Sequence, residues 1–434
     1  MKLISKIFVL LFGMSAMAAA QQEYSLTLEQ AIELGLQNHQ QLKIAAENVD
    51  VSKNQLQTAK NQMLPSVEFS ANAFYLGDVT ILNSDWSKVQ TVEMPHFGNT
   101  FGLQASQLLY KGGVIRKSIE ITELKMQLAE LDRTSNEQDI KFLIISNYLD
   151  IQKLLNQIKV LELNKALAAQ VLENVTKMFE QEMVTRNEVI RSELQIKNLE
   201  QTLLTLKNSH AILSNQLSYA LGLPADVLII PEESHYLGIV LQAQNSYSEL
   251  AHERHPALMM TEKNVEIAES AIAIQKSNWF PAITAFGGYN MQRPVTTSMP
   301  AMDLYNNSWQ VGINLTFKLD NLYKNRQNVN TARSQARVAQ VALTLVQQNI
   351  DVGVNAAFLK CCEAEQQVYL MDEAKTLANE NYEIVQSKYL NQLAIMAEMT
   401  DASNAKLNAD LQFVNAVINA QFQYYSLLKS TGTL

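Results

Sequence analysis

Apolar side chains recur at helical spacing through two long stretches of this 434-residue chain. Between Gly113 and Gly222 there is neither glycine nor proline, and from Ile313 to Thr431 the only such residue is Gly353. Because these two residue types interrupt helices most strongly, both stretches are predicted to be long helices. In the first stretch the apolar positions step by three and four, which is typical of a coiled-coil seam with one polar interruption in each of two runs. The runs are Ile151, Leu154, Ile158, Leu161, Lys165, Ala168, Leu172, Val175 and Phe179, then Ile196, Leu199, Leu203, Leu206, His210, Leu213 and Leu217.

Apolar and polar residues alternate with a period of two where the second stretch begins. From Trp309 to Leu319 every odd position is apolar and every even position is polar or glycine. This length and alternation are those of a transmembrane β-strand with lipid on one face and water on the other. Weaker alternation elsewhere gives four expected strands in all, near residues 66–75, 100–110, 282–291 and 308–319. Polar loops near 76–99 and 292–307 are expected between the strands of each pair.

The chain also repeats itself. Asn38-His39-x-x-Leu42 returns as Arg254-His255-x-x-Leu258, and Pro65 returns as Pro281. Further on, Phe179, Glu188 and Gly222 correspond to Tyr389, Glu398 and Gly432. A repeat of this length makes each copy a structural half rather than a solenoid unit. We expect a first repeat at 21–223, a linker at 224–246 and a second repeat at 247–434, with helical hairpin tips near 181–188 and 391–398.

Residues 1–20 have the features of a secretory signal peptide, because Lys2 and Lys6 precede an apolar run that ends in small residues. The formal net charge is −9 at pH 7, which disfavours nucleic acid as a partner. Cys361 and Cys362 are neighbours in a predicted helix and point in different directions, so no disulfide between them is expected.

The four predicted strands of an exported chain must belong either to a soluble sheet or to a membrane barrel. Four strands are too few for a soluble sandwich of this size, and an open sheet edge is not tolerated in hydrocarbon. The smallest membrane barrels have about eight strands. Several copies must therefore pool their strands, in an oligomer of at least two chains. A soluble sheet sandwich is the alternative for these strands, because alternation is equally expected there. A soluble periplasmic coiled-coil scaffold, which would form no barrel, is the corresponding alternative for the function.

Several segments, taken together, resemble the TolC family of outer-membrane efflux proteins. They are the repeated helix start from Leu26 to Asn38, Pro65 and Pro281 before the first strand of each half, the strand-to-helix junction Gln107–Gly113, and the two hairpin tips. Each motif alone is weak, but their order is specific because it is duplicated over the whole mature chain.

The resemblance implies a mainly α fold with a β-barrel contribution. Four strands from each chain of a homotrimer would close a twelve-stranded barrel in the outer membrane of a Gram-negative bacterium. Long coiled-coil hairpins would continue it as a tunnel through the periplasm. The protein would be no enzyme but the exit duct of a tripartite efflux or type I secretion system. Its partners would be outer-membrane lipid, a periplasmic adaptor and an inner-membrane transporter of the RND, ABC or MFS type. A stand-alone passive pore is the rival, and the long helices argue against it because porins lack them.

Candidate functional residues lie at the hairpin tips. Glu398 and Asp401 are three apart and share one helix face. The resemblance implies that they ring the narrow periplasmic end of the pore, where carboxylates favour cations. Stabilisation of the helix dipole is the alternative explanation for Glu188 and Glu398. The resemblance also assigns Glu188 and Tyr389 to bonds that close the tip, with Arg186 as the nearby basic residue.

The tips depart from the family pattern at three positions. Ala394 stands where an arginine closes the gate in the best-known member, and Glu182 and Gln392 replace the usual glycines. The residues expected to contact the adaptor are Met183, Val184, Thr185, Leu393, Ala394 and Ile395. Trp279 and Trp309 are expected as anchors at the membrane interfaces.

No motif indicates a metal, a cofactor or a catalytic residue. His252-Glu253-Arg254-His255 differs from the metalloprotease pattern His-Glu-x-x-His. His255 is already explained as the repeat partner of His39, so we expect no metal site there.

Overall fold

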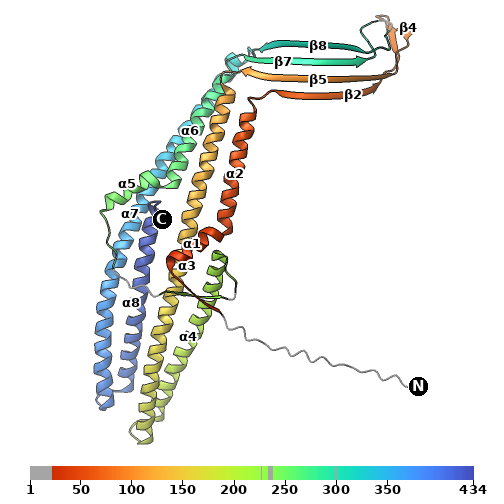
Figure 1. Ribbon diagram of the computed structural model, residues 1–434. Helices are drawn as coiled ribbons and strands as arrows, with labels where there is room; N and C mark the ends of the chain where they lie inside the picture. The colour runs from red at the N-terminus through yellow and green to blue at the C-terminus, as the bar shows by residue number, and fades with distance from the viewer. Residues whose placement is uncertain (1–21, 226, 233–237, 299–300) are drawn as a thin grey trace, which may run out of the picture. The chain divides into compact units, whose positions relative to one another are not determined.

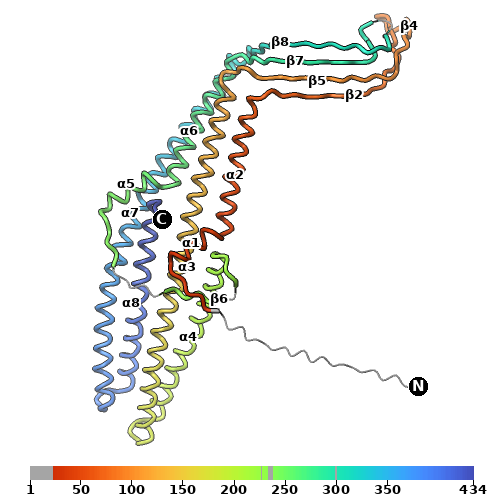
Figure 2. Tube along the Cα trace, in the orientation of Figure 1, coloured from red at the N-terminus to blue at the C-terminus, as the bar shows by residue number. Residues whose placement is uncertain are grey.

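The computed structural model describes residues 22–225, 227–232, 238–298 and 301–434 (Figures 1 and 2). The expected signal peptide at 1–20 lies outside these residues. By contacts, the chain divides into two compact units. The first contains the chain up to Lys43, Asn136–His255 and Ile350–Leu434, and the second contains Ile44–Ser135 and Pro256–Asn349.

The first unit is dominated by two helical hairpins (Figure 1). Helix α3 (Val114–Glu180) turns back into α4 (Arg186–Leu221). Helix α7 (Asn321–Leu390) turns back into α8 (Met396–Ser430). The predicted long helices are therefore confirmed, and they occur once in each half of the sequence.

Most of the predicted seam of the first hairpin is buried or partly buried, and Phe179 at its end is 37% exposed. Five of its members form one apolar cluster, consisting of Ile158, Leu161, Ala168, Leu199 and Leu203. Both polar interruptions have partners. Lys165 Nζ lies 3.0 Å from Glu200 Oε1 on α4, and His210 Nε2 lies 2.9 Å from the carbonyl oxygen of Ile229. The seam therefore tolerates a lysine and a histidine because neither leaves a buried polar group unsatisfied.

A short mixed segment packs against the helices of the first unit. Strand β1 (Gln22–Leu26) pairs in parallel with β6 (Val227–Pro231), and helices α1 (Leu28–Asn38) and α5 (Gln244–Arg254) lie in the same unit. The Tyr148 hydroxyl of α3 donates to the carbonyl oxygen of Leu26 at 3.0 Å. Burial raises the pKa of Tyr148 to about 12, so this bond persists at any physiological pH.

Two repeat-related glycines end α4 and α8. Gly222 has φ +73° and Gly432 has φ +71°, a conformation that side chains disfavour. A Cβ on Gly222 would lie 2.7 Å from Asn38 Cβ, and one on Gly432 would lie 2.7 Å from His255 Cα. In each half, the end of the last helix thus packs against the break between the first two helices, at Asn38 in one half and at His255 in the other. This equivalence confirms the twofold repeat.

The second unit contains helices α2 (Gln40–Asn61) and α6 (Pro256–Ser277) and a four-stranded antiparallel sheet. The strand order is β2-β5-β7-β8. Their bounds are Ser66–Tyr75, Phe97–Tyr110, Ala282–Arg293 and Asn306–Thr316.

The strand register gives this sheet two chemically different faces. One row across all four strands is apolar, and the next row is polar or glycine. The apolar row is Phe69, Leu103, Tyr289 and Trp309, and the polar row is Ser70, Gly102, Asn290 and Ser308. Phe69 is 67% exposed and Trp309 is 73% exposed. The sheet therefore leaves large apolar side chains uncovered in a single chain.

Two expectations are corrected by the structure. The loop expected at 76–99 contains the hairpin β3 (Val79–Leu82) and β4 (Lys88–Val92), and β5 already begins at Phe97. Strand β8 ends at Thr316 although the alternation continues to Leu319, because the Asn321 amide donates to Lys318 and starts α7. Among the described residues, no helix has the length and hydropathy required to cross a bilayer.

Candidate functional site at the hairpin tips

Both hairpins reverse through the same turn. The residue in the left-handed conformation is Glu182 in one turn (φ +59°) and Gln392 in the other (φ +61°). In each turn the following amide donates back to the last helical turn, to Met178 at 2.9 Å and to Lys388 at 2.8 Å. This geometry favours glycine, and another residue there costs about 1–2 kcal/mol. Both turns therefore contain a left-handed residue although neither position holds glycine.

A side-chain hydrogen bond to a carboxylate joins the two tips. The Tyr389 hydroxyl of α7 donates to Glu188 Oε2 of α4 at 3.1 Å. Tyr389 is only 4% exposed. Burial, and then the bond to the Glu188 carboxylate, raise the pKa of Tyr389 well above its ordinary value, so the hydroxyl keeps its proton.

An apolar cluster surrounds this bond and includes residues of both hairpins. Val175 and Val189 belong to the first hairpin, and the remaining members belong to the second. These are Tyr382, Tyr389, Met396, Met399 and Ala402. The tips are thus held together by shared apolar burial around one hydrogen bond to a carboxylate.

The acidic and basic candidates lie outside that cluster. Glu398 is exposed, and its Oε2 accepts the Ile395 amide at 3.2 Å, so it caps the start of α8. Asp401 is also exposed, one turn along the same helix face. Arg186 lies 3.8 Å from Glu193 Oε1 on its own helix. The structure therefore brings Glu188 and Tyr389 together but does not bring Arg186 to them.

Of the six residues expected to contact an adaptor, two are partly buried and four are exposed. Val184 and Ala394 are partly buried against the tip cluster. The exposed four are Met183, Thr185, Leu393 and Ile395. Gln392 Nε2 approaches Met183 Sδ at 3.9 Å, a second contact between the tips.

The hairpins are also joined further from the tips, by hydrogen bonds that were not predicted. Gln195 Nε2 of α4 donates to Ser403 Oγ of α8 at 3.1 Å. Gln157 Nε2 of α3 donates to Asn415 Oδ1 of α8 at 2.7 Å. The only sequence signal is a polar residue within a helical stretch, and such a residue is usually solvated.

The expected membrane anchors lie at opposite ends of the β7–β8 pair. Trp279 is partly buried between the end of α6 and the start of β7. Trp309 lies near the start of β8, opposite Tyr289.

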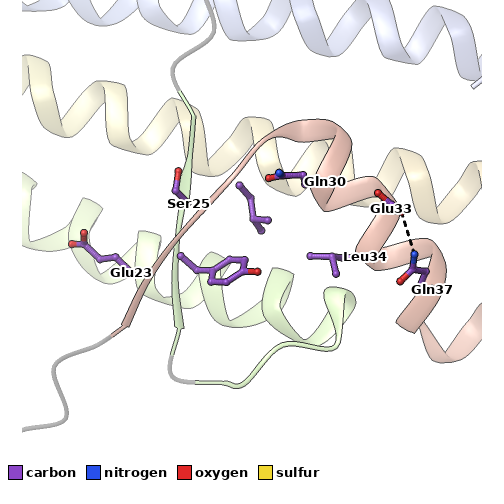
Figure 3. Close-up of a pocket in the computed structure, with 8 residues that line it drawn as sticks. Glu23, Ser25, Gln30, Glu33, Leu34 and Gln37 are labelled. Carbon is purple, nitrogen blue, oxygen red and sulfur yellow. Dashed lines mark hydrogen bonds between the residues drawn. The ribbon is translucent and has the colours of Figure 1, made fainter.

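A pocket away from the tips lies beside β1 and α1 (Figure 3). It has a volume of about 570 Å³, and its polar lining includes Glu23, Gln30, Glu33 and Gln37. The amide of Gln37 donates to Glu33 at 3.3 Å, as the dashed line shows (Figure 3). Throughout the described part of the chain, no three His, Cys, Asp or Glu side chains are grouped to hold a metal ion.

Comparison with known proteins gives a consistent picture. A family model described as outer membrane efflux protein matches residues 31–223 and 247–433. No curated protein matches the sequence. Among solved structures, CusC is similar with a TM-score of 0.80 and 16% identity, over 94% of this chain and 92% of that one.

Two further outer-membrane proteins share the fold at low identity. VceC of Vibrio cholerae has a TM-score of 0.76 and 16% identity, over 93% of this chain and 96% of its own. The CmeC outer membrane channel of Campylobacter jejuni has a TM-score of 0.76 and 15% identity, over 94% of this chain and 85% of its own.

Proposed function

Because this chain belongs to the outer membrane efflux protein family, we propose that it forms the exit duct of a tripartite efflux or type I secretion system. The exposed apolar face of the four-stranded sheet carries this proposal. Rows such as Phe69, Leu103, Tyr289 and Trp309 form a surface that water disfavours. That surface suits the hydrocarbon of the outer membrane, while the polar face suits a water-filled lumen.

A trimer would remove the open edges of this sheet. Strands β2 and β8 are at its two ends, and unpaired edges are not tolerated in lipid. Three chains would supply twelve strands and close a barrel. Within the first unit, α7 also exposes apolar residues that recur seven residues apart, with one step of eleven, a pattern that favours cover by a helix of another chain. They are Val352, Leu359, Leu370, Leu377 and Ile384.

The tips would form the gate and the docking surface. The bond between Tyr389 and Glu188 holds two hairpins of one chain together, and its loss would allow them to part. Glu398 and Asp401, copied around a threefold axis, would form a ring of carboxylates that favours cations. The exposed turn residues would meet a periplasmic adaptor, which links the duct to an inner-membrane transporter of the RND, ABC or MFS type.

Conductance across a planar bilayer tests this function. We expect the detergent-purified full chain to form small, cation-selective channels that divalent cations block. Replacing Glu398 and Asp401 together with alanine should remove the block and reduce the cation preference. A wide, unselective wild-type channel would instead favour a stand-alone pore. Failure of folded protein to insert would favour the soluble scaffold.

A further inference from the structure

A groove lies in the second unit where β5 leads into α3. Its volume is about 510 Å³, within the range of small-molecule sites. It is lined by the strand end Gln107–Tyr110, by Met63 beyond α2, and by the first turn of α3. Lys111 and Arg116 lie at its rim.

The two cations of this groove are uncompensated. Neither Lys111 nor Arg116 forms an ion pair with any residue that the structure describes. The neighbouring Lys117 differs, because its Nζ lies 2.7 Å from Glu120. Lys111 and Arg116 are thus the unpaired positive charges of the groove, and they are available to an anionic group from outside the chain.

The corresponding junction in the second half has a different charge pattern. Where β8 leads into α7, Asp320 lies between Lys318 and Lys324 in the sequence, and Lys324 Nζ is 3.0 Å from Asp320 Oδ2. A carboxylate at that junction offsets its lysines. The first junction therefore differs in having no carboxylate between its two cations, whereas Asp320 lies between Lys318 and Lys324 in the second.

The walls of the groove continue the apolar face of the sheet. Tyr110 pairs across the strands with Ile283, on the face that carries the exposed apolar row. Tyr110 also packs edge-on against Phe280, with ring centroids 6.4 Å apart. Met63 and Leu109 are more than half exposed, at 55% and 57%. Apolar surface therefore extends to the position of the two cations.

One buried polar atom in the groove lacks a partner. The side-chain oxygen of Gln107 is inaccessible to solvent and accepts no hydrogen bond from any described residue. Such an atom costs free energy unless a donor reaches it. A ligand that fills this groove should therefore carry an anionic group, an apolar body and a hydrogen-bond donor.

We propose that this groove binds an anionic glycerophospholipid of the periplasmic leaflet. The phosphate lies between Lys111 and Arg116, and the acyl chains follow the apolar wall past Leu109 and Tyr110. A headgroup hydroxyl, as in phosphatidylglycerol, donates to the oxygen of Gln107. This inference rests on the proposed function, because it requires the sheet to lie in the membrane.

Native mass spectrometry of the detergent-solubilised full chain tests the site. Phosphatidylglycerol and phosphatidylcholine are titrated separately, and the fraction of lipid-bound protein is measured. The wild type should retain phosphatidylglycerol preferentially. Lys111→Gln and Arg116→Gln should each weaken its binding about fivefold, the effect of one cation beside an anionic lipid. Lys318→Gln is the matched control, since it removes a lysine charge at the other strand-to-helix junction, outside the residues that line the groove, and it should change binding less than twofold.

Equal weakening by Lys318→Gln would overturn the proposal, because the effect would then be one of general charge. Equal retention of both lipids by the wild type would also overturn it. Flotation of the same protein with phosphatidylcholine vesicles tests membrane insertion separately. A chain that does not float contradicts the proposed function itself, whereas a chain that floats without lipid preference contradicts only the groove.

Discussion

Replacing Tyr389 with phenylalanine removes one hydroxyl and leaves the ring in the tip cluster. The bond lost joins Tyr389 to the Glu188 carboxylate at 3.1 Å, and bonds to charged groups contribute about 1.5–3 kcal/mol. Glu188 is only partly buried, so water can solvate it afterwards and the lower end applies. About 1.5 kcal/mol shifts a closed-to-open equilibrium roughly tenfold per chain, and roughly a thousandfold if three tips open together.

Single-channel recording in a planar bilayer measures this shift directly. Tyr389→Phe should increase the fraction of time spent in the high-conductance state, and Glu188→Gln should add little in the double variant. Tyr369→Phe is the matched control, because Tyr369 donates to Glu373 at 2.8 Å within α7 and joins no hairpins. Wild-type gating in Tyr389→Phe, from protein with unchanged thermal stability, would refute the idea that this bond holds the tip closed.

Further predictions concern the sheet and the repeat. Ile313→Lys, on the apolar face, should destabilise the assembled barrel by about 2–4 kcal/mol if it lies at mid-membrane, whereas Asn314→Lys on the polar face should be tolerated. Trimer yield after detergent extraction measures both, and equal losses would contradict the assignment of the faces. Gly432→Ala should lower the melting temperature, because its left-handed backbone costs about 1–2 kcal/mol and its Cβ would meet His255 Cα at 2.7 Å. Ser430→Ala, which loses only a bond to Leu427 within the helix end, should melt close to wild type.

The sequence allowed prediction of the long helices but not of every strand. Absence of glycine and proline between Gly113 and Gly222 leaves few alternatives to helix. The β3–β4 hairpin was missed because its turn places Trp86, not glycine, at φ +67°, and the turn residues Asn83, Ser84 and Asp85 are equally typical of an irregular loop. The β1–β6 pair was missed because parallel strands far apart in sequence leave no local pattern.

The tips were predictable in position but not in pairing. Repeat matching located Glu188, Tyr389 and Glu398 from the sequence alone. It did not predict that Arg186 pairs with Glu193, because several carboxylates lie within reach of a flexible arginine. Nor did it distinguish a carboxylate that joins two hairpins from one that caps a helix, since both functions favour glutamate in a first helical turn.

The bond between Tyr389 and Glu188 makes the duplicated halves unequal. In the repeat, Tyr389 corresponds to Phe179 and Glu188 corresponds to Glu398. The repeat-equivalent bond would join Phe179 to Glu398, but Phe179 has no hydroxyl group. Glu398 instead caps its own helix. The two hairpins are thus copies of one unit, but only one of the two equivalent bonds between them exists, from Tyr389 of the second hairpin to Glu188 of the first. In a ring of such chains, tethered and untethered contacts would alternate, and opening would begin as a threefold parting along one kind of boundary rather than a sixfold dilation.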